Sequence, residues 1–149
     1  PQKWVSRYRP HQPPNNTRTM RMAKMGQLYF YGVKEIVKIV DGDTVDFRID
    51  LGFDLSIKIR VRLVGINAWE SRTRSKKEKK LGLAAKARLK EICEEAMEKE
   101  TLKISTTEKG KYGRYLGVIY ANGKSVNDQL VKEGHAHYYD GGKRKAFSG

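Results

Sequence analysis

The chain has 149 residues, 38% of them hydrophobic, which is enough for one folded core but not for two. It carries 31 lysines and arginines against 17 acids, so its formal net charge is +14. This balance favours a polyanionic partner, either nucleic acid or an anionic membrane surface. Because every apolar run is only strand-sized, insertion into a membrane is excluded. With one cysteine, Cys93, the chain cannot form an intramolecular disulfide, and we expect Cys93 to be a small buried residue.

The composition divides the chain into three parts. Residues 1–26 hold all four prolines, six cations and no acid, so we expect a basic, flexible N-terminal arm. Residues 27–139 are predicted to form one domain, and residues 140–149 a basic C-terminal tail. No signal peptide or transmembrane segment is visible, which leaves an intracellular protein and a processed secreted one equally open.

Alternating apolar and polar residues predict five strands. The clearest alternation is in two consecutive strands joined through Gly52, each with one face toward the core. The five predicted strands cover residues 33–40, 45–51, 55–63, 102–106 and 115–120.

Two helices are predicted among these strands. Apolar residues at spacings of three and four mark one face of a helix between the third and fourth strands: Leu81, Ala84, Ala85, Leu89, Ile92, Cys93 and Ala96. A basic loop at residues 71–80 is expected before it. After the fifth strand, Ser125 is a predicted N-cap of a second helix that ends at Gly134. The order is that of an α+β, mainly β fold: a five-stranded OB-fold barrel with a helix between strands three and four and another after strand five.

Three short segments carry candidate chemistry. They are an Asp-Gly-Asp-Thr run at residues 41–44, the segment from Arg62 to Glu70, and a Lys-Tyr-Gly-Arg run at residues 111–114. Each has an ordinary structural explanation when taken alone: a tight turn, a surface arginine with an acid in the first turn of a helix, and a turn glycine between charged neighbours.

Taken together, the order and spacing of these segments resemble the staphylococcal nuclease (thermonuclease) family across about residues 33–139. The resemblance implies an OB-fold domain that acts as a calcium-dependent endonuclease. Such an enzyme hydrolyses phosphodiester bonds of DNA and RNA with little sequence specificity and leaves 3′-phosphate ends. By the same resemblance, Arg62 and Arg114 grip the scissile phosphate, and Glu70 is the proposed general base for water.

The resemblance also implies a Ca²⁺ site. Asp43 corresponds to the first metal-binding carboxylate, Asn67 to the second, and the carbonyl of Ala68 to a further ligand. This chain departs from the family pattern at two places: Asn67 replaces an aspartate and Trp69 replaces a proline. Because an amide oxygen still binds calcium, we expect a weakened metal site, and Trp69 is expected to change how the Glu70 loop is held.

The remaining implied residues contact substrate. Lys111 and Tyr112 match residues that hold a neighbouring phosphate, and Tyr139 is a candidate aromatic against a base, one position out of register. DNA or RNA is therefore the expected partner of a monomeric enzyme. The alternative is a non-catalytic OB-fold module that binds nucleic acid without turnover, which would not require Arg62, Glu70 and Arg114 together.

Overall fold

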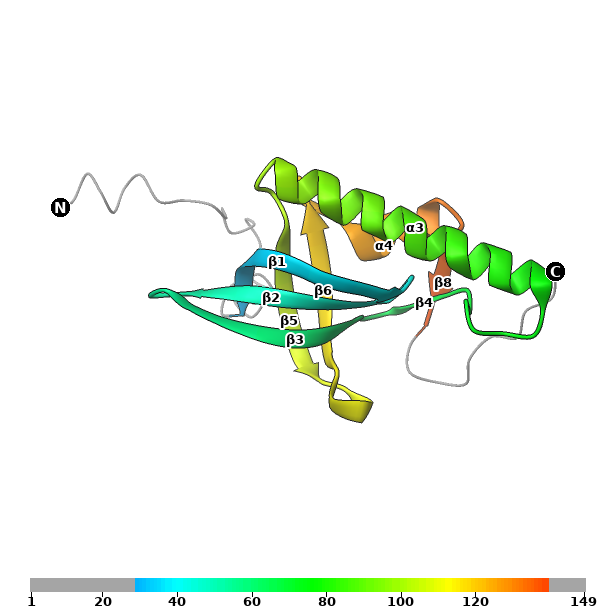
Figure 1. The fold of residues 1–149 in the computed structure, drawn as a ribbon, viewed down its shortest axis with the longest axis horizontal. Coiled ribbons are helices and arrows are strands. Elements are labelled where there is room, and N and C mark those ends of the chain that lie inside the picture. Colours follow the sequence, from blue (N-terminus) through cyan, green and yellow to red (C-terminus); the bar gives the residue numbers. More distant parts are fainter. Residues whose placement is uncertain (1–28, 140–149) are drawn as a thin grey trace, which may run out of the picture.

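Five strands form the closed barrel at the centre of the molecule (Figure 1). The structure is a computed structural model that describes residues 29–139, so the predicted arm at 1–26 and tail at 140–149 lie outside the described residues. The barrel strands are β1 (Phe30–Asp41), β2 (Thr44–Gly52), β3 (Leu55–Leu63), β5 (Lys103–Lys109) and β6 (Tyr115–Ala121). Neighbours in the order β3-β2-β1-β5-β6 pair antiparallel, and a parallel pairing of β3 with β6 closes the barrel. The predicted α+β OB-fold architecture is confirmed.

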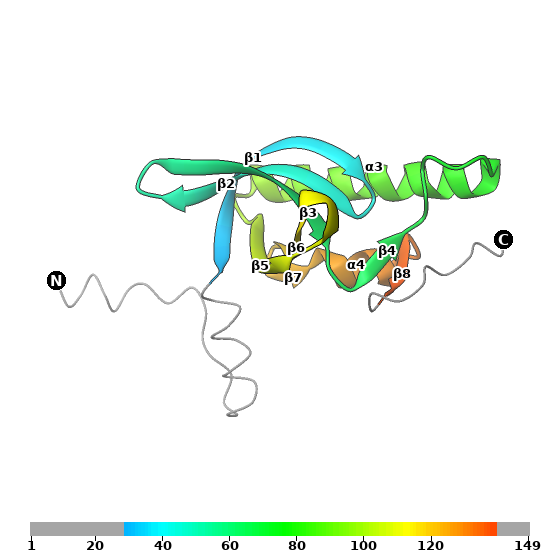
Figure 2. The same cartoon turned by 90° about the horizontal axis from the view of Figure 1, so that it is seen from below.

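The β2–β3 hairpin extends beyond the barrel (Figure 2). Inside the barrel, its alternation gives the predicted core, because Phe47 and Val61 are completely buried. Toward its turn the same alternation no longer faces a core. Leu51, Leu55 and Ile57 are 40%, 59% and 46% exposed, so the expectation of half-buried strands over their full length is wrong at this end. The reason is geometric: the two strands are longer than the layer of side chains that covers them.

Several short elements were not predicted. β4 (Ile66–Ala68) pairs with β8 (Ala136–Tyr138) in a separate two-stranded sheet, and β7 (Lys124–Ser125) pairs with β6. η1 (Lys111–Gly113) is a short turn in which Tyr112 has a positive φ of 61°. Segments of two or three residues are too short to show a periodic pattern, so sequence alternation could not reveal them.

The long helix α3 (Lys76–Glu98) follows β4 and precedes β5 in the chain, and it lies along one side of the barrel (Figure 1). It begins inside the stretch predicted as a basic loop, so the loop is shorter than residues 71–80. Ser75 caps the helix by accepting a hydrogen bond from the Glu78 backbone N–H at 3.3 Å, and the sequence contains the Ser-x-x-Glu pattern that marks such a helix start. The buried face consists of Gly82, Ala85, Leu89, Ile92, Cys93 and Ala96. Leu81 and Ala84 are exposed, which corrects the predicted stripe at two positions.

The second helix, α4 (Val126–Lys132), matches its prediction. Ser125 accepts a hydrogen bond from the Asp128 N–H at 3.2 Å, and Gly134 follows the helix at a positive φ of 82°. Arg88 of α3 reaches Glu133 at the end of α4 with an Nε–Oε1 distance of 2.6 Å, and hydrogen bonds from Arg88 and Gln129 lower the pKa of Glu133 to about 2. Both helices are therefore fixed to each other beside the barrel.

The expectation for Cys93 is met. Cys93 is buried, and loss of water raises the pKa of its thiol to about 12. Within residues 29–139, no helix is long and apolar enough to cross a membrane.

Candidate active site

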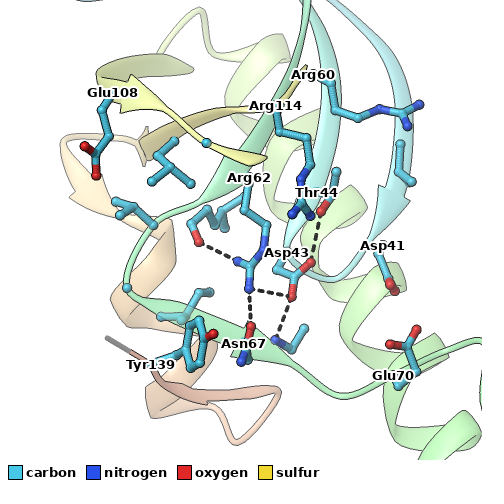
Figure 3. A pocket seen from close by; sticks show the side chains of 18 of the residues that line it. Asp41, Asp43, Thr44, Arg60, Arg62, Asn67, Glu70, Glu108, Arg114 and Tyr139 are labelled. Carbon is cyan, nitrogen blue, oxygen red and sulfur yellow. Dashed lines mark hydrogen bonds and ion pairs between the residues drawn. The ribbon is translucent and has the colours of Figure 1, made fainter. Parts of the chain in front are cut away.

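One pocket of about 930 Å³ collects most of the predicted site residues (Figure 3). It lies where the β1–β2 turn, the end of β3, β4 and the start of β6 meet. The predicted residues that line it are Asp43, Arg62, Asn67, Ala68, Glu70, Arg114 and Tyr139. Segments far apart in the sequence therefore converge on one pocket, as the resemblance required.

The β1–β2 turn fixes the Asp43 carboxylate. Its Oδ1 accepts a hydrogen bond from the Thr44 hydroxyl at 3.0 Å, and its Oδ2 accepts one from the Ala68 backbone N–H at 3.0 Å. Gly42 makes this close packing possible, because a β-carbon there would lie 2.8 Å from the β-carbons of both Ala68 and Ala85. The turn is thus pressed against the β4 segment and α3, which holds Asp43 in place.

Arg62 points into the pocket and contacts two other candidate residues. Its Nη2 lies 3.4 Å from Asp43 Oδ2 and also donates a hydrogen bond to the side-chain oxygen of Asn67, while its Nη1 donates to the Leu63 carbonyl at 2.6 Å (Figure 3). The Arg62 side chain is only 12% exposed. The alternative of an ordinary surface arginine is therefore wrong, and the guanidinium is oriented by its neighbours before any ligand binds.

The segment after Arg62 is held by the barrel through Asn127, a buried residue of α4. The Asn127 amide donates to the carbonyls of Val64 and Gly117 at 2.9 and 3.2 Å and accepts from the Ile119 N–H at 3.2 Å. Three hydrogen bonds of this buried side chain therefore join α4, β6 and the site segment. The contacts of Asn127 could not be predicted from the sequence, because a polar residue on a helix carries no sign of what it contacts.

Glu70 is positioned by a close contact with α3. A β-carbon on Gly82 would come within 2.5 Å of the Glu70 backbone, so only glycine lets the helix approach this segment. Next to Glu70, the Ser71 hydroxyl donates to the Asp41 carboxylate at 2.9 Å. Burial raises the pKa of Asp41 above its ordinary value despite this hydrogen bond, and the negative charges of Asp43 and Glu70 raise it further.

Glu70 is not the only acid at the pocket apart from Asp43. Asp41 and Glu108, to which the resemblance gave no role, line it as well. The sequence contained a signal for Asp41, since it begins the same Asp-Gly-Asp-Thr run as Asp43.

The 111–114 run is brought only partly to the pocket. Arg114 lines it, and its guanidinium carbon lies 5.6 Å from the ring centre of Tyr112. Tyr112 itself is 90% exposed and does not line the pocket, and Lys111 is placed only by its backbone in η1. Tyr139 lines the pocket at the opposite side, where its N–H donates to the Gly65 carbonyl at 2.8 Å.

The pocket offers oxygen ligands that suit a hard divalent cation. Three of its four carboxylates, Asp41, Asp43 and Glu70, are close enough to repel one another at Asp41, and a bound positive charge would relieve this repulsion. The Asn67 amide lines the pocket as well and offers a further oxygen. Within residues 29–139, no three His, Cys, Asp or Glu side chains form a ready-made metal cluster. A cation held here would therefore depend on amide, backbone or substrate oxygens as well as on carboxylates.

Comparison with known proteins shows to which family the chain belongs. The family model described as staphylococcal nuclease homologue matches residues 60–147, more than half of the chain. The chain belongs to the staphylococcal nuclease family.

Named relatives agree with this assignment. A micrococcal nuclease of Shigella flexneri is 32% identical over 114 residues, which cover 70% of this chain and 57% of the relative. An uncharacterized endonuclease of Escherichia coli O157:H7 is 29% identical over 106 residues, covering 70% of this chain and 60% of that protein. A probable staphylococcal-like nuclease of Oryza sativa subsp. japonica, CAN1, is 36% identical over 85 residues, 57% of this chain and 23% of its own length. The chain thus spans at most about three fifths of these relatives.

Both departures from the staphylococcal nuclease family pattern now have a structural setting. Asn67 lies in β4 opposite His137 of β8 and accepts the hydrogen bond from Arg62. Trp69 donates from its indole N–H to the Gly134 carbonyl at 3.2 Å, and its ring centre lies 5.4 Å from that of His137. The indole therefore ties the residue before Glu70 to the turn that follows α4.

Proposed function

We propose that this chain is a calcium-dependent endonuclease domain that hydrolyses phosphodiester bonds of DNA and RNA with little sequence preference. The observation that carries the proposal is the convergence of Arg62, Glu70, Arg114 and Asp43 on one pocket in a chain of the staphylococcal nuclease family. The nuclease names of the relatives support it. We further propose that the domain acts as a monomer.

Arg62 and Arg114 supply positive charge where a phosphodiester would react. Two planar guanidinium groups can each hold two phosphate oxygens, and they stabilise the additional negative charge that develops when phosphorus becomes five-coordinate. Because Asp43 and Asn67 already orient Arg62, little reorganisation of its side chain is needed when a phosphate enters. We expect this preorganisation to be the largest protein contribution to the rate.

Glu70 is proposed to orient a water molecule and take its proton. The water oxygen attacks phosphorus, the bond to the 5′ oxygen breaks, that oxygen takes up a proton from solvent and leaves as a hydroxyl, and the 3′ side keeps the phosphate. General base catalysis of this kind contributes about a hundred- to ten-thousand-fold. The tight contact of the Glu70 backbone with Gly82 supports this role, because it fixes the segment that carries the carboxylate.

Calcium is proposed to bind among Asp43, Asn67 and the Ala68 carbonyl, with Asp41 as an additional acid on the same side of the pocket. When bound, a hard cation screens the phosphate oxygens and makes phosphorus more electrophilic. Within the pocket only Tyr139 offers an aromatic ring for stacking on a base, and neither stacking nor phosphate binding distinguishes sequences. Lys111 and Tyr112 are proposed to hold a neighbouring phosphate outside the pocket.

The test is a nicking assay on supercoiled plasmid and a parallel assay on single-stranded RNA, each with calcium and with a chelator. We expect cleavage of both substrates only with calcium, and 3′-phosphate ends on the products. Glu70→Gln should lower the rate about a hundred-fold or more, whereas Glu98→Gln, a charge change at the far end of α3, should not. Binding without cleavage under every condition would instead identify the chain as a nucleic-acid-binding module.

A further inference from the structure

A row of cations, here called the ladder, runs from the pocket along the outer face of the barrel. Along β3 it consists of Arg62, Arg60 and Lys58. The residues between them, Val61 and Ile59, have side chains that face inward. Because successive side chains of a strand point to opposite faces, the three cations lie on one side. Arg62 and Arg60 line the pocket, and Figure 3 shows both beside it, so the ladder is continuous with the candidate active site.

Strand register extends this ladder across two more strands. Asp46 of β2 lies opposite Arg60, and Lys38 of β1 lies opposite Asp46. In the next row, Arg48 of β2 lies opposite Lys58. Since directly paired residues share a face, these side chains form one surface, the β1–β3 basic face, made of Lys38, Arg48, Lys58, Arg60 and Arg62 with the acids Glu35 and Asp46.

The acids on this face neutralise only part of its charge. Arg60 makes two hydrogen bonds to Asp46, at 2.7 and 3.0 Å, and these bonds, with the nearby charges of Arg60, Lys58 and Lys38, lower the pKa of Asp46. Among residues 29–139, Glu35 forms an ion pair only with Arg48, with 3.4 Å between Glu35 Oε2 and Arg48 Nε, and both side chains are exposed. In the described part of the chain, neither Lys38 nor Lys58 makes an ion pair, so the face keeps an excess of positive charge beside the pocket.

The pairing of cations across β2 and β3 does not stabilise the fold. Like charges directly opposite each other on neighbouring strands destabilise a sheet, and Arg48 faces Lys58 in this way. A phosphate between the two would convert this repulsion into attraction. Asp46 fixes the orientation of the Arg60 guanidinium, which lies at the edge of the pocket and can bind a phosphate there.

We propose that the β1–β3 basic face binds the phosphates of the substrate strand outside the cleavage site. The inference rests on the proposed nuclease function and adds the path that the strand takes on one side of the pocket. Strand residues rise about 3.4 Å each, so Lys58 lies about 14 Å along the strand from Arg62. A stacked nucleic-acid strand rises about 3.4 Å per nucleotide, so this distance corresponds to about four nucleotides.

The contacts along the ladder can therefore form only with a polymeric substrate. A dinucleotide that fills the pocket cannot reach Lys58, whereas a strand of about twelve nucleotides can contact the whole face. Contacts to phosphates carry no sequence information, so the face increases affinity for long strands without selecting among them.

The test compares two charge-neutralised proteins with the wild type. The ladder variant is Lys38→Gln with Lys58→Gln, and its matched control is Lys86→Gln with Lys90→Gln on α3, which removes the same charge elsewhere. Binding of a fluorescent twelve-nucleotide single strand is measured against salt in a chelator, where no cleavage is expected. The log–log salt slope of the ladder variant should be shallower by about 1.4, while the control keeps the wild-type slope.

A second readout uses turnover with calcium. The ratio of kcat/KM for the twelve-nucleotide strand to that for a dinucleotide should fall several-fold in the ladder variant and stay at the wild-type value in the control. Equal slopes in the ladder variant and the wild type, or equal losses in ladder variant and control, would overturn the proposed path. So would a loss of binding to phosphatidylserine vesicles without any loss on the oligonucleotide.

The two proposals can fail separately. If the wild type cleaves but the two variants do not differ, the nuclease stands and the path is wrong. If the wild type cleaves nothing while the salt slopes differ as expected, the surface binds nucleic acid and the hydrolytic function is wrong.

Discussion

The two ends of the β2–β3 hairpin are made from the same alternating pattern, yet they have different surroundings. At one end Thr44 pairs with Arg62 beside the pocket, where Arg62 contacts Asp43 and Asn67 of β4. At the other end Gly52 pairs with Leu55, and the turn carries Phe53 with 95% of its surface exposed. Precise placement of side chains therefore comes from the elements packed around a strand, since the strand pattern is the same where such placement is absent.

A pair of phenylalanines on this hairpin tests the contrast most strongly. Phe47 is completely buried and Phe53 is exposed, so Phe47→Ala should lower the free energy of unfolding by about 3–5 kcal/mol. Phe53→Ala should change it by no more than about 0.5 kcal/mol, because it leaves no cavity. Urea unfolding of both variants measures the difference. A loss of about 2 kcal/mol or more in Phe53→Ala would mean that the turn packs against another part of the protein.

Changing Arg62 tests the site end directly. Arg62→Lys keeps the charge but cannot contact Asp43, Asn67 and a phosphate with one planar fork, so turnover should fall about a hundred-fold or more. The matched control is Arg74→Lys, since Arg74 is exposed and does not line the pocket. Single-turnover cleavage of a labelled oligonucleotide gives both rates. Full activity in Arg62→Lys would remove Arg62 from the catalytic assignment.

The same contrast explains what the sequence could predict. Alternation and helical spacing identified the five barrel strands and both helices, because each element is long enough to show its period. They did not show how deep a strand lies, so Leu55 and Ile57 were assigned to a core that does not reach them. Depth depends on which other segments cover a strand, and local pattern carries no information about that.

The candidate site shows the same limit at the level of single residues. The resemblance to the staphylococcal nuclease family pointed to Arg62, Glu70 and Arg114, and the fold brings all three to the pocket. The residues that hold them could not be read from the sequence. Asn127 and Gly82 act through contacts with segments that are distant along the chain, and a glycine or asparagine in a helix has no local feature that reveals such a partner.

Gly82 gives a smaller test of how the surroundings of the site position it. At an open helical position, replacing glycine by alanine usually stabilises a protein by about 0.5–1 kcal/mol. Here the new β-carbon would overlap the Glu70 backbone, so Gly82→Ala should destabilise the fold by about 1–3 kcal/mol and lower the single-turnover rate. Thermal unfolding and cleavage are measured on the same preparation. A raised Tm with an unchanged rate would show that α3 does not press on Glu70.

The smallest expected effect concerns Asn67, where the site offers an amide in place of a charged ligand. Calcium sites adjust affinity through the number of carboxylates, so Asn67→Asp should tighten calcium binding about tenfold without nucleic acid. The gain is limited because Arg62 already donates a hydrogen bond to this side chain and would pair more strongly with a carboxylate, in competition with the metal. Calorimetric calcium titration of the wild type and Asn67→Asp measures the change, and repeating it in an Arg62→Ala background should enlarge the gain. If Asn67→Asp leaves the calcium affinity unchanged both with Arg62 present and in the Arg62→Ala background, residue 67 is not a calcium ligand. If Asn67→Asp raises the affinity by the same factor in both backgrounds, Arg62 does not compete with calcium for residue 67.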